Sequence, residues 1–220
     1  MLSVPVLRAV LWDLDGTLVD SADYHWRSWR DTAAREGIDL TYEQFLRSFG
    51  QKNDRILRGW LGDETPVERI QRIGEAKETE YRRLAREGSL TALPGAAAWV
   101  ERLHRDGWRQ AIASSAPRAN VDVMLSVLGF DRFFDAIVSA EDVAAGKPDP
   151  EVFLTAAARL GVPPSQCVVV EDAAAGIEAA RRAGMRSIGV SRTERLSADV
   201  SVASLADLPE DAFDRLVRSA

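Results

Sequence analysis

The stretch from Val6 to Ser21 reads V-L-R-A-V-L-W-D-L-D-G-T-L-V-D-S. It begins as a short run of mainly apolar residues and closes in D-L-D-G-T, which is typical of a buried strand that ends in a turn. Similar runs occupy residues 111–115, 136–139, 167–172 and 187–190, and a weaker one occupies 200–202. Helical patterns lie between them at residues 95–105, 119–128, 150–160 and 174–183. This alternation predicts an α/β fold, with a Rossmann-like parallel sheet core and helices on both faces.

Residues 19–90 break this alternation, because they contain no convincing strand. Their helical patterns cover residues 22–36, 42–48, 54–61 and 66–86. The last of these carries Glu and Arg at helical spacing, as solvated helices do. We therefore expect a discontinuous core, residues 1–18 and 91–220, that is interrupted by an inserted helical domain, residues 19–90.

The composition narrows the classes of partner and metal. The chain of 220 residues has a formal net charge of −6, which argues against nucleic acid as a partner. One cysteine and two histidines exclude a cysteine zinc cluster and favour a hard, oxygen-bound ion. The apolar start of the chain contains Arg8 and ends in Asp13, which argues against a signal peptide or a membrane span. We expect a cytoplasmic monomer that binds neither nucleic acid nor a membrane.

Polar residues collect where the predicted strands end. Because the carboxyl ends of parallel strands meet at one edge of a sheet, we expect these side chains to lie together. The set comprises Asp13, Asp15, Ser114, Ser115, Lys147, Glu171 and Asp172. Two like charges about 4 Å apart repel by roughly 4 kcal/mol at an effective dielectric constant of about 20, and a divalent cation removes this cost. Oxygen ligands without nearby sulfur or imidazole favour Mg²⁺, which also binds substrate phosphate oxygens.

The D-L-D-G-T segment also indicates a chemistry. Asp13 and Asp15 are two positions apart, so both can face one cavity. One carboxylate can attack a phosphorus atom, while the other, kept protonated, gives its proton to the leaving oxygen. Gly16 would let backbone N–H groups approach a phosphate, and Thr17 and Ser115 add hydroxyls to bind the substrate. Taken singly, any of these residues could instead cap a helix or end a solvated strand.

Four segments resemble, in order, the four signature motifs of the haloacid dehalogenase superfamily. They are D-L-D-G-T-L-V-D-S (13–21), Ser114, G-K-P-D-P (146–150) and V-V-V-E-D-A-A-A-G-I-E-A-A (168–180). The resemblance covers nearly the whole chain. It implies that Asp13 is a nucleophile that forms an aspartyl-phosphate, and that Asp15 is the general acid that later activates water. Dehalogenases and phosphonate-cleaving relatives lack an aspartate at the second position, so the resemblance favours a phosphatase or a phosphomutase.

The same resemblance implies the remaining roles at this edge. Mg²⁺ would be held by Asp13, the Asp15 carbonyl and Asp172, with Glu171 bound directly or through water. Ser114 would hydrogen-bond the transferring phosphoryl group, and Lys147 would offset the charge of Asp13 and phosphate. Ala173 stands where many relatives carry a serine.

The inserted segment resembles the cap domain of the β-phosphoglucomutase-like branch, best in residues 20–29 and 49–57. In this superfamily such a cap closes over the active site and contacts the leaving group. We expect His25 to help place Asp15 or to sense closure, and the alternative is a buried structural histidine. Lys52 and Asn53 follow Gly50 at a turn and are expected to contact a polar substrate, the alternative being a solvated helix start.

The other notable residues of the chain have simpler expectations. We expect the tryptophans at positions 26, 29 and 60 to form the core of the insertion. His104 and Lys77 are expected at the surface, and Cys167 is expected to be an inert buried thiol.

These expectations lead to a Mg²⁺-dependent phosphatase that acts on a small phosphorylated metabolite, such as a sugar phosphate. The alternative is a β-phosphoglucomutase-type phosphomutase, although this chain has K-N-D-R-I (52–56) where the mutases usually carry an arginine and a serine. A third hypothesis is a phospho-aspartate signalling module, since receiver domains also phosphorylate an aspartate at a strand end. Against it, the acceptor here follows the first strand, and a switch domain does not need the large insertion.

Overall fold

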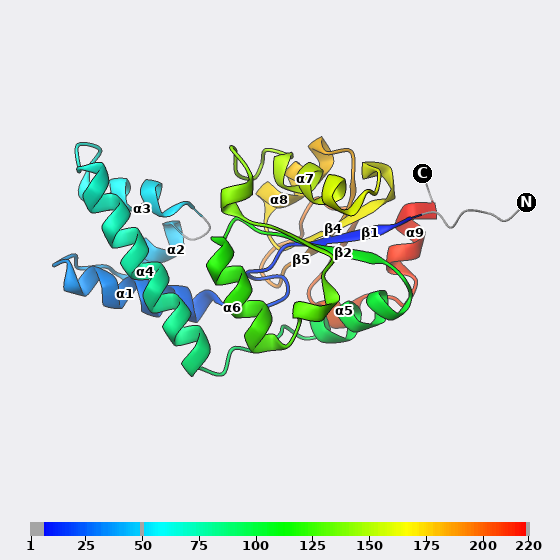
Figure 1. Ribbon diagram of the computed structural model, residues 1–220, viewed down its shortest axis with the longest axis horizontal. Coiled ribbons are helices and arrows are strands. Elements are labelled where there is room, and N and C mark those ends of the chain that lie inside the picture. The colour runs from blue at the N-terminus through cyan, green and yellow to red at the C-terminus, as the bar shows by residue number, and fades with distance from the viewer. Residues whose placement is uncertain (1–6, 49–50, 219–220) are drawn as a thin grey trace, which may run out of the picture. The chain divides into compact units, whose positions relative to one another are not determined.

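The computed structural model describes residues 7–48 and 51–218 (Figure 1). The expected strand start at Val6 and the expected turn at Gly50 lie outside these residues. The chain forms two compact units. The core unit contains the chain up to Asp20 and from Thr91 onward, and the helical insertion contains residues 21–90.

Within the described residues, six parallel strands form the sheet of the core unit, in the order β3-β2-β1-β4-β5-β6. The strands are β1 (Ala9–Trp12), β2 (Arg109–Ala113), β3 (Ala136–Val138), β4 (Cys167–Glu171), β5 (Arg186–Val190) and β6 (Val200–Val202). Strand β1, the first in the sequence, lies inside the sheet, because Trp12 pairs with Ile112 on one side and with Val170 on the other. This confirms the predicted α/β fold with a parallel sheet. Strand β1 begins at Ala9, so it is shorter than the run that predicted it.

Helices cover both faces of this sheet (Figure 1). The longer helices of the core unit are α5 (Ala96–Arg105), α6 (Arg118–Leu128), α7 (Glu151–Leu160), α8 (Ala174–Arg182) and α9 (Ala212–Arg218). Single 3₁₀ turns are η1 (Asp131–Phe133), η2 (Ala140–Asp142), η3 (Pro164–Gln166) and η4 (Leu205–Asp207).

Alternate residues of β1 serve the two faces of the sheet, as the period of a strand requires. Leu11 is buried in the same apolar cluster as Phe153 of α7 and Ala180 of α8. The indole of Trp12 instead packs near Phe213 of α9, with ring centroids 6.0 Å apart. Strand β1 is therefore buried on both sides, and its carboxyl end is fixed in place by packing.

The turn after β1 is held by backbone hydrogen bonds. The Asp13 N–H donates to the Val170 carbonyl at 2.9 Å, and the Gly16 N–H donates to the Val19 carbonyl at 2.9 Å. Gly16 has a φ of +83°, and a Cβ there would lie 2.1 Å from the Asp172 Oδ2 atom. Only glycine can occupy this position while Asp172 keeps its place.

The helical insertion contains α1 (Ala22–Arg35), α2 (Tyr42–Ser48), α3 (Asn53–Leu61) and α4 (Val67–Glu87). Helix α4 packs against α1 and α3. The apolar faces of these helices form a hydrophobic core within the insertion. This confirms the expectation that Trp26, Trp29 and Trp60 pack inside the insertion. The described core residues are Trp29, Phe45, Ile56, Leu57, Ile70 and Ile73, with Trp26, Leu40, Trp60 and Leu61 packed against them.

The insertion leaves and rejoins the core unit at adjacent backbone positions. Val19 and Ala92 form an antiparallel bridge, and the Leu93 N–H donates to the Leu18 carbonyl at 2.9 Å. The Asp20 N–H donates to the Thr91 carbonyl at 3.4 Å.

Among the helices in the described ranges, none combines the length and the apolar composition that crossing a membrane needs.

Candidate active site

Lys147 joins two carboxylates at the carboxyl edge of the sheet. Its Nζ atom lies 2.6 Å from the Asp13 Oδ1 atom and 2.6 Å from the Glu171 Oε1 atom. Asp13 follows β1, Glu171 ends β4, and Lys147 comes from the loop before α7. All three side chains are at least nine-tenths buried, so both pairs are shielded from water.

The Glu171 carboxylate is also fixed from its other side. Its Oε2 atom accepts a hydrogen bond from the Ala173 N–H at 2.8 Å. A Cβ at Gly176, in the first turn of α8, would lie 1.9 Å from the Glu171 carboxylate carbon. The glycine therefore leaves the space that lets Glu171 reach Lys147.

Burial and like charge dominate the electrostatics of this cluster. Burial raises the pKa of Asp13 well above its usual range, although the ammonium of Lys147 acts in the opposite direction. Burial, followed by the charges of Glu171 and Asp15, raises the pKa of Asp172 to about 7. Burial alone would lower the pKa of Lys147, but the carboxylates of Asp13 and Glu171 outweigh it and hold that pKa above its usual value.

The donor set fits a hard divalent cation. One carboxylate oxygen from each of Asp13, Glu171 and Asp172 lies within 4.8 Å of the others. Three carboxylates beside one ammonium leave an excess of negative charge when all are ionised, and a divalent cation would balance it. Both Glu171 oxygens already accept hydrogen bonds, from Lys147 and from Ala173. Asp13 and Asp172 are thus the carboxylates with more capacity left for an ion.

The other residues expected at this edge are present but differ in exposure. The Asp15 carboxyl is half-buried and close enough to Asp172 for its charge to raise the Asp172 pKa. Ser114 is buried beyond the end of β2, where its N–H donates to the Val138 carbonyl at 3.0 Å. Its Oγ atom accepts a hydrogen bond from the Ala116 N–H at 3.0 Å. The neighbouring Ser115 is exposed.

A cavity of about 270 Å³ adjoins this cluster in the core unit. Gly16, Thr17 and Asp172 line one part of it, and the loop after β5, residues 191–194, lines another. Thr17 is fully buried, and within the described part of the chain its Oγ1 atom has no hydrogen-bond partner. Thr17 thus borders the cavity, while its hydroxyl is enclosed in the protein.

Within the helical insertion, His25 belongs to a partly buried polar cluster. Its Nδ1 atom lies 3.0 Å from the Lys77 Nζ atom, and its ring stacks on Tyr81 with centroids 4.2 Å apart. Lys77 is only 2% exposed, so the expectation that it lies at the surface was wrong. Glu78 accepts a hydrogen bond from Lys77 at 2.9 Å.

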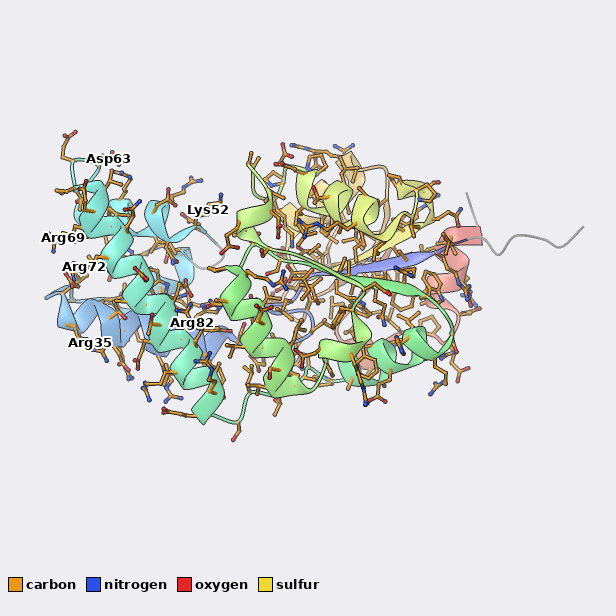
Figure 2. The ribbon with its side chains drawn as sticks, viewed as in Figure 1. Arg35, Lys52, Asp63, Arg69, Arg72 and Arg82 are labelled. Atoms are coloured by element: carbon orange, nitrogen blue, oxygen red, sulfur yellow. The ribbon has the colours of Figure 1, made fainter. Side chains whose placement is uncertain are left out.

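Asn53 and Lys52 have different surroundings, although they are neighbours in the sequence at the start of α3. The Asn53 Nδ2 atom donates to the Glu78 Oε1 atom at 2.6 Å, so Asn53 is tied to the polar cluster rather than solvated. Lys52, labelled in Figure 2, is exposed. Contact of His25, Lys52 or Asn53 with a substrate stays a prediction.

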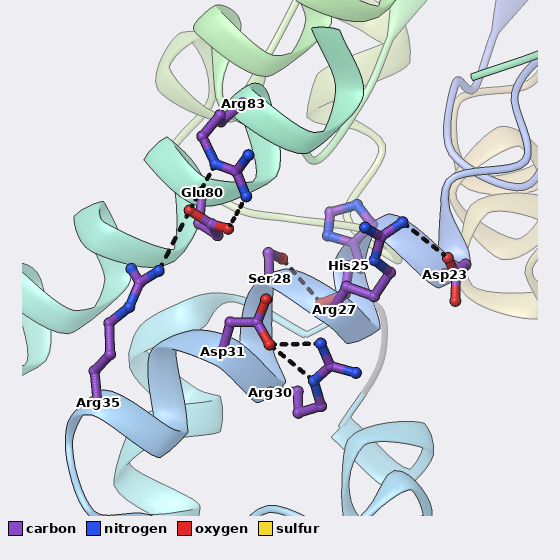
Figure 3. Close-up of polar contacts among 9 residues, drawn as sticks. All are labelled: Asp23, His25, Arg27, Ser28, Arg30, Asp31, Arg35, Glu80 and Arg83. Atoms are coloured by element: carbon purple, nitrogen blue, oxygen red, sulfur yellow. Dashed lines mark hydrogen bonds and ion pairs between the residues drawn. The ribbon is translucent and has the colours of Figure 1, made fainter. Parts of the chain in front are cut away.

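Ion pairs outside the polar cluster of His25, Lys77 and Glu78 also connect α1 to α4. Glu80 of α4 accepts from Arg83 at 2.6 Å and lies 3.7 Å from Arg35 of α1 (Figure 3). Near the end of α1, Glu36 accepts two hydrogen bonds from Arg72, at 2.6 and 2.8 Å. These contacts are at or near the surface and fix how the two helices pack, and they offer no reactive group.

An α/β core whose first strand leads into two aspartates, beside a lysine and an acidic pair, defines a hydrolase of the haloacid dehalogenase type. The family model described as haloacid dehalogenase-like hydrolase matches residues 7–184. The chain belongs to this family, which confirms the resemblance inferred from its four motifs.

Comparison with individual proteins shows where the chain lies within the family. It is 36% identical over 213 residues to β-phosphoglucomutase of Bacillus subtilis, covering 92% of each chain. It is 34% identical over 183 residues to the fructose-1-phosphate phosphatase YqaB of Escherichia coli, covering 82% of this chain and 95% of YqaB. The crystal structure of CbbY from Rhodobacter sphaeroides in complex with phosphate superposes with a TM-score of 0.86 at 30% identity, covering 95% of this chain and 100% of CbbY. The resemblance to the β-phosphoglucomutase-like branch is thereby confirmed.

The burial of Lys77 and its neighbours was not predicted from the sequence. Helix α4 carries so many charged residues that its pattern indicated a solvated face. The available signal was the spacing of Ile70, Ile73, Lys77 and Tyr81, which places the lysine on the apolar stripe of the helix.

Proposed function

We propose that this protein is a Mg²⁺-dependent phosphatase that hydrolyses a small phosphorylated metabolite through an aspartyl-phosphate on Asp13. The observation that carries the proposal is the position of the Lys147 ammonium, 2.6 Å from both Asp13 and Glu171, beside Asp172 at the carboxyl edge of the sheet. A buried carboxylate beside a fixed ammonium is a suitable acceptor for a phosphoryl group, because the ammonium offsets the charge that builds up there.

The reaction has two steps. In the first, an Asp13 oxygen attacks the phosphorus atom, the bond from phosphorus to the leaving oxygen breaks, and Asp15 gives a proton to that oxygen. In the second, Asp15 takes a proton from water, the water oxygen attacks phosphorus, and the bond to Asp13 breaks. Inorganic phosphate leaves, and both aspartates return to their starting state.

The neighbouring groups would stabilise the phosphoryl group during both steps. Ser114 and Lys147 would contact its oxygens, and Gly16 would leave the backbone open to it. The buried Thr17 hydroxyl and the exposed Ser115 hydroxyl are further candidates for substrate contact. Asp13, the Asp15 carbonyl and Asp172 would hold Mg²⁺, with Glu171 linked to it directly or through water. The ion would supply positive charge to the phosphoryl oxygens.

A sugar phosphate is the substrate class that the relatives favour. Both a fructose-1-phosphate phosphatase and a β-phosphoglucomutase share about a third of their residues with this chain. We propose that the leaving group is selected by the helical insertion, with His25, Lys52 and Asn53 as the residues to test.

The proposal is tested by measuring phosphate release from a panel of phosphorylated sugars and other small metabolites, with and without Mg²⁺. We expect release from at least one sugar phosphate, dependence on Mg²⁺, and complete loss in the Asp13→Asn variant. The matched control is Asp23→Asn, at an exposed position of α1, which should retain full activity. The absence of any release that depends on Asp13 would contradict the proposal.

A phosphomutase is the second candidate, and the identity to β-phosphoglucomutase over 92% of both chains favours it. In that case Asp13 would pass its phosphoryl group to a sugar hydroxyl instead of water. Incubation with β-glucose 1-phosphate and catalytic β-glucose 1,6-bisphosphate distinguishes the two. Formation of glucose 6-phosphate faster than phosphate would assign the mutase, and phosphate alone would assign the hydrolase.

A signalling module predicts a different kinetic result from either enzyme. After exposure to a phosphoryl donor, Asp13 would keep its acyl phosphate for hours without turnover. Rapid loss of the acyl phosphate, with release of one phosphate per cycle, is what we expect instead.

A further inference from the structure

Lys147 is held in place without support from a helix or strand of its own. It lies in the loop between η2 and α7, yet its Nζ atom lies 2.6 Å from both Asp13 and Glu171. A lysine side chain has four rotatable methylene links and loses much conformational freedom when fixed. The loop backbone must therefore be restrained by other contacts.

Glu151, the first residue of α7, reaches back to this loop. Its Oε2 atom accepts hydrogen bonds from two successive backbone groups, the Ala144 N–H at 2.9 Å and the Ala145 N–H at 3.0 Å. These residues precede Lys147 by three and two positions. A single carboxylate oxygen thus anchors the start of the lysine loop to α7.

The end of the same loop is closed by a second set of contacts. The Asp149 Oδ1 atom accepts a hydrogen bond from the Glu151 N–H at 3.0 Å, and the Asp149 N–H donates to the Gly146 carbonyl at 3.1 Å. Helix α7 is itself fixed, because it packs against β1, β2 and β3 and its Arg159 contacts Asp142 and the Ile137 carbonyl. The loop is therefore attached to one of the most firmly packed helices of the core unit.

We propose that Glu151 is a positioning residue that keeps Lys147 between Asp13 and Glu171 by anchoring the Ala144–Ala145 backbone. This deepens the proposed function, on which its kinetic consequences rest. Glu151 does not touch the substrate in this proposal. It acts on the reaction only through the lysine loop.

A simpler role for Glu151 makes different predictions. An acidic residue in the first turn of a helix is stabilising by itself, through the helix dipole. In that case removal of Glu151 would lower the stability of the protein and leave the position of Lys147 unchanged. The two roles can be separated because one acts on the loop and the other on the helix.

The first experiment needs no catalytic activity. Amide hydrogen exchange is measured at Ala144 and Ala145 in the wild type, in Glu151→Ala and in Glu151→Gln. The chain has three lysines, so reductive methylation followed by mass spectrometry reports on Lys147 separately from Lys52 and Lys77. We expect faster exchange at both alanines and faster methylation of Lys147 in Glu151→Ala. Glu151→Gln should lie between, because a neutral amide oxygen is a weaker acceptor than a carboxylate.

The second experiment measures kcat and KM on the substrate found in the panel. We expect Glu151→Ala to lower kcat by about 10- to 100-fold with little change in KM, since a small misplacement of a catalytic group has effects of this order. Glu151→Gln should restore much of the rate. In a Lys147→Ala background, Glu151→Ala should cause no further loss, because the residue it positions is gone.

The matched control is Asp199→Ala, which removes another carboxylate that accepts a backbone hydrogen bond in the core unit. The Asp199 Oδ2 atom accepts from the Ser187 N–H at 2.8 Å, at the start of β5 and so at the opposite end of the strands from Asp13. This variant should leave kcat and the methylation of Lys147 unchanged.

The proposal is overturned if Glu151→Ala leaves both the exchange at Ala144 and Ala145 and the methylation of Lys147 as in the wild type. An equal loss of kcat in the presence and absence of the Lys147 side chain would also overturn it. If the wild type hydrolyses no phosphorylated compound, the proposed function fails while the exchange and methylation results still decide the role of Glu151. If Glu151→Ala does not fold, the exchange rates in Glu151→Gln decide.

Discussion

The His25 Nδ1 atom lies 3.0 Å from the Lys77 Nζ atom, inside the helical insertion. Because an ammonium can only donate, the Nδ1 atom is the acceptor in this contact when Lys77 is protonated. The ammonium also lies 5.4 Å from the ring centre of Trp29 and 5.3 Å from that of Tyr81, within the range of cation–π attraction. A buried lysine, a glutamate and a histidine thus hold α1 and α4 together where an apolar contact would be expected.

Replacing Lys77 should destabilise the insertion. Lys77→Met keeps most of the side-chain volume but leaves Glu78 buried without its ammonium partner. Breaking a buried ion pair in this way costs about 3 kcal/mol or more of the free energy of unfolding. Urea unfolding followed by tryptophan fluorescence would measure it. The control is Lys52→Met at an exposed position, which should change the stability by less than about 0.5 kcal/mol. Equal stabilities of the two variants would contradict the prediction.

Mg²⁺ should stabilise the folded protein through the carboxylate cluster. At a concentration about 100 times its dissociation constant, a ligand that binds only the folded state adds roughly 2.7 kcal/mol. Thermal unfolding after treatment with a chelator, with and without added Mg²⁺, tests this. Asp172→Asn should abolish the response and should also raise the melting temperature of the metal-free protein, because it removes repulsion by Glu171 and Asp15. A full response to Mg²⁺ in this variant would exclude Asp172 as a ligand.

Gly176 should not tolerate even alanine. The added methyl group would displace the Glu171 carboxylate, which it would approach within 1.9 Å, and would thereby disturb the partner of Lys147. We expect a loss of about 1 to 3 kcal/mol in stability, typical of overpacking, together with a large fall in kcat. Gly59 of α3 is the matched control, since a Cβ there meets nothing within 4 Å. Gly59→Ala should stabilise the protein by about 0.5 to 1 kcal/mol.

Cys167 should react slowly with thiol reagents while the protein is folded. Burial raises the pKa of this thiol to about 12 from its ordinary value of 9.0, so little thiolate is present near neutral pH. The folded state therefore favours the protonated thiol. Its contribution to stability is complete below about pH 9 and is lost as the pH rises from about 9 toward 12. Titration with a disulfide reagent at pH 8 should show slow reaction without urea, where the thiol is buried, and fast reaction in urea, where it is exposed. Equally fast reaction in both would contradict the burial of this thiol.

The sheet and the edge that carries the candidate active site could be predicted from sequence because both follow from local patterns. Buried parallel strands are short apolar runs, and the rule that ligands bind at their carboxyl ends selects residues such as Asp13 and Asp172 without knowledge of the packing. The weak run at residues 200–202 also forms a strand, β6, which pairs in parallel with β5.

The polar cluster of the insertion was not predictable in the same way. The side chains that surround Lys77 come from α1 and α4, so its burial depends on contacts such as the one with His25, which lies 52 positions away in the sequence. The pairing of Asn53 with Glu78 has the same origin, since 25 positions separate them. For Glu171, the sequence indicated an acidic group at a strand end, while the division of its two oxygens between Lys147 and Ala173 depends on the three-dimensional arrangement.

The paired backbone around Val19 and Ala92 has a consequence for how such proteins diversify. Because the two points of departure are hydrogen-bonded to each other, the core unit is continuous across the junction without help from residues 21–90. An exchange of the whole inserted segment would leave the sheet, its edge and its lysine loop intact. Under the proposed function, recombination or drift within this one contiguous stretch of the gene would change the substrate that is recognised and leave the groups that carry out the reaction unaltered.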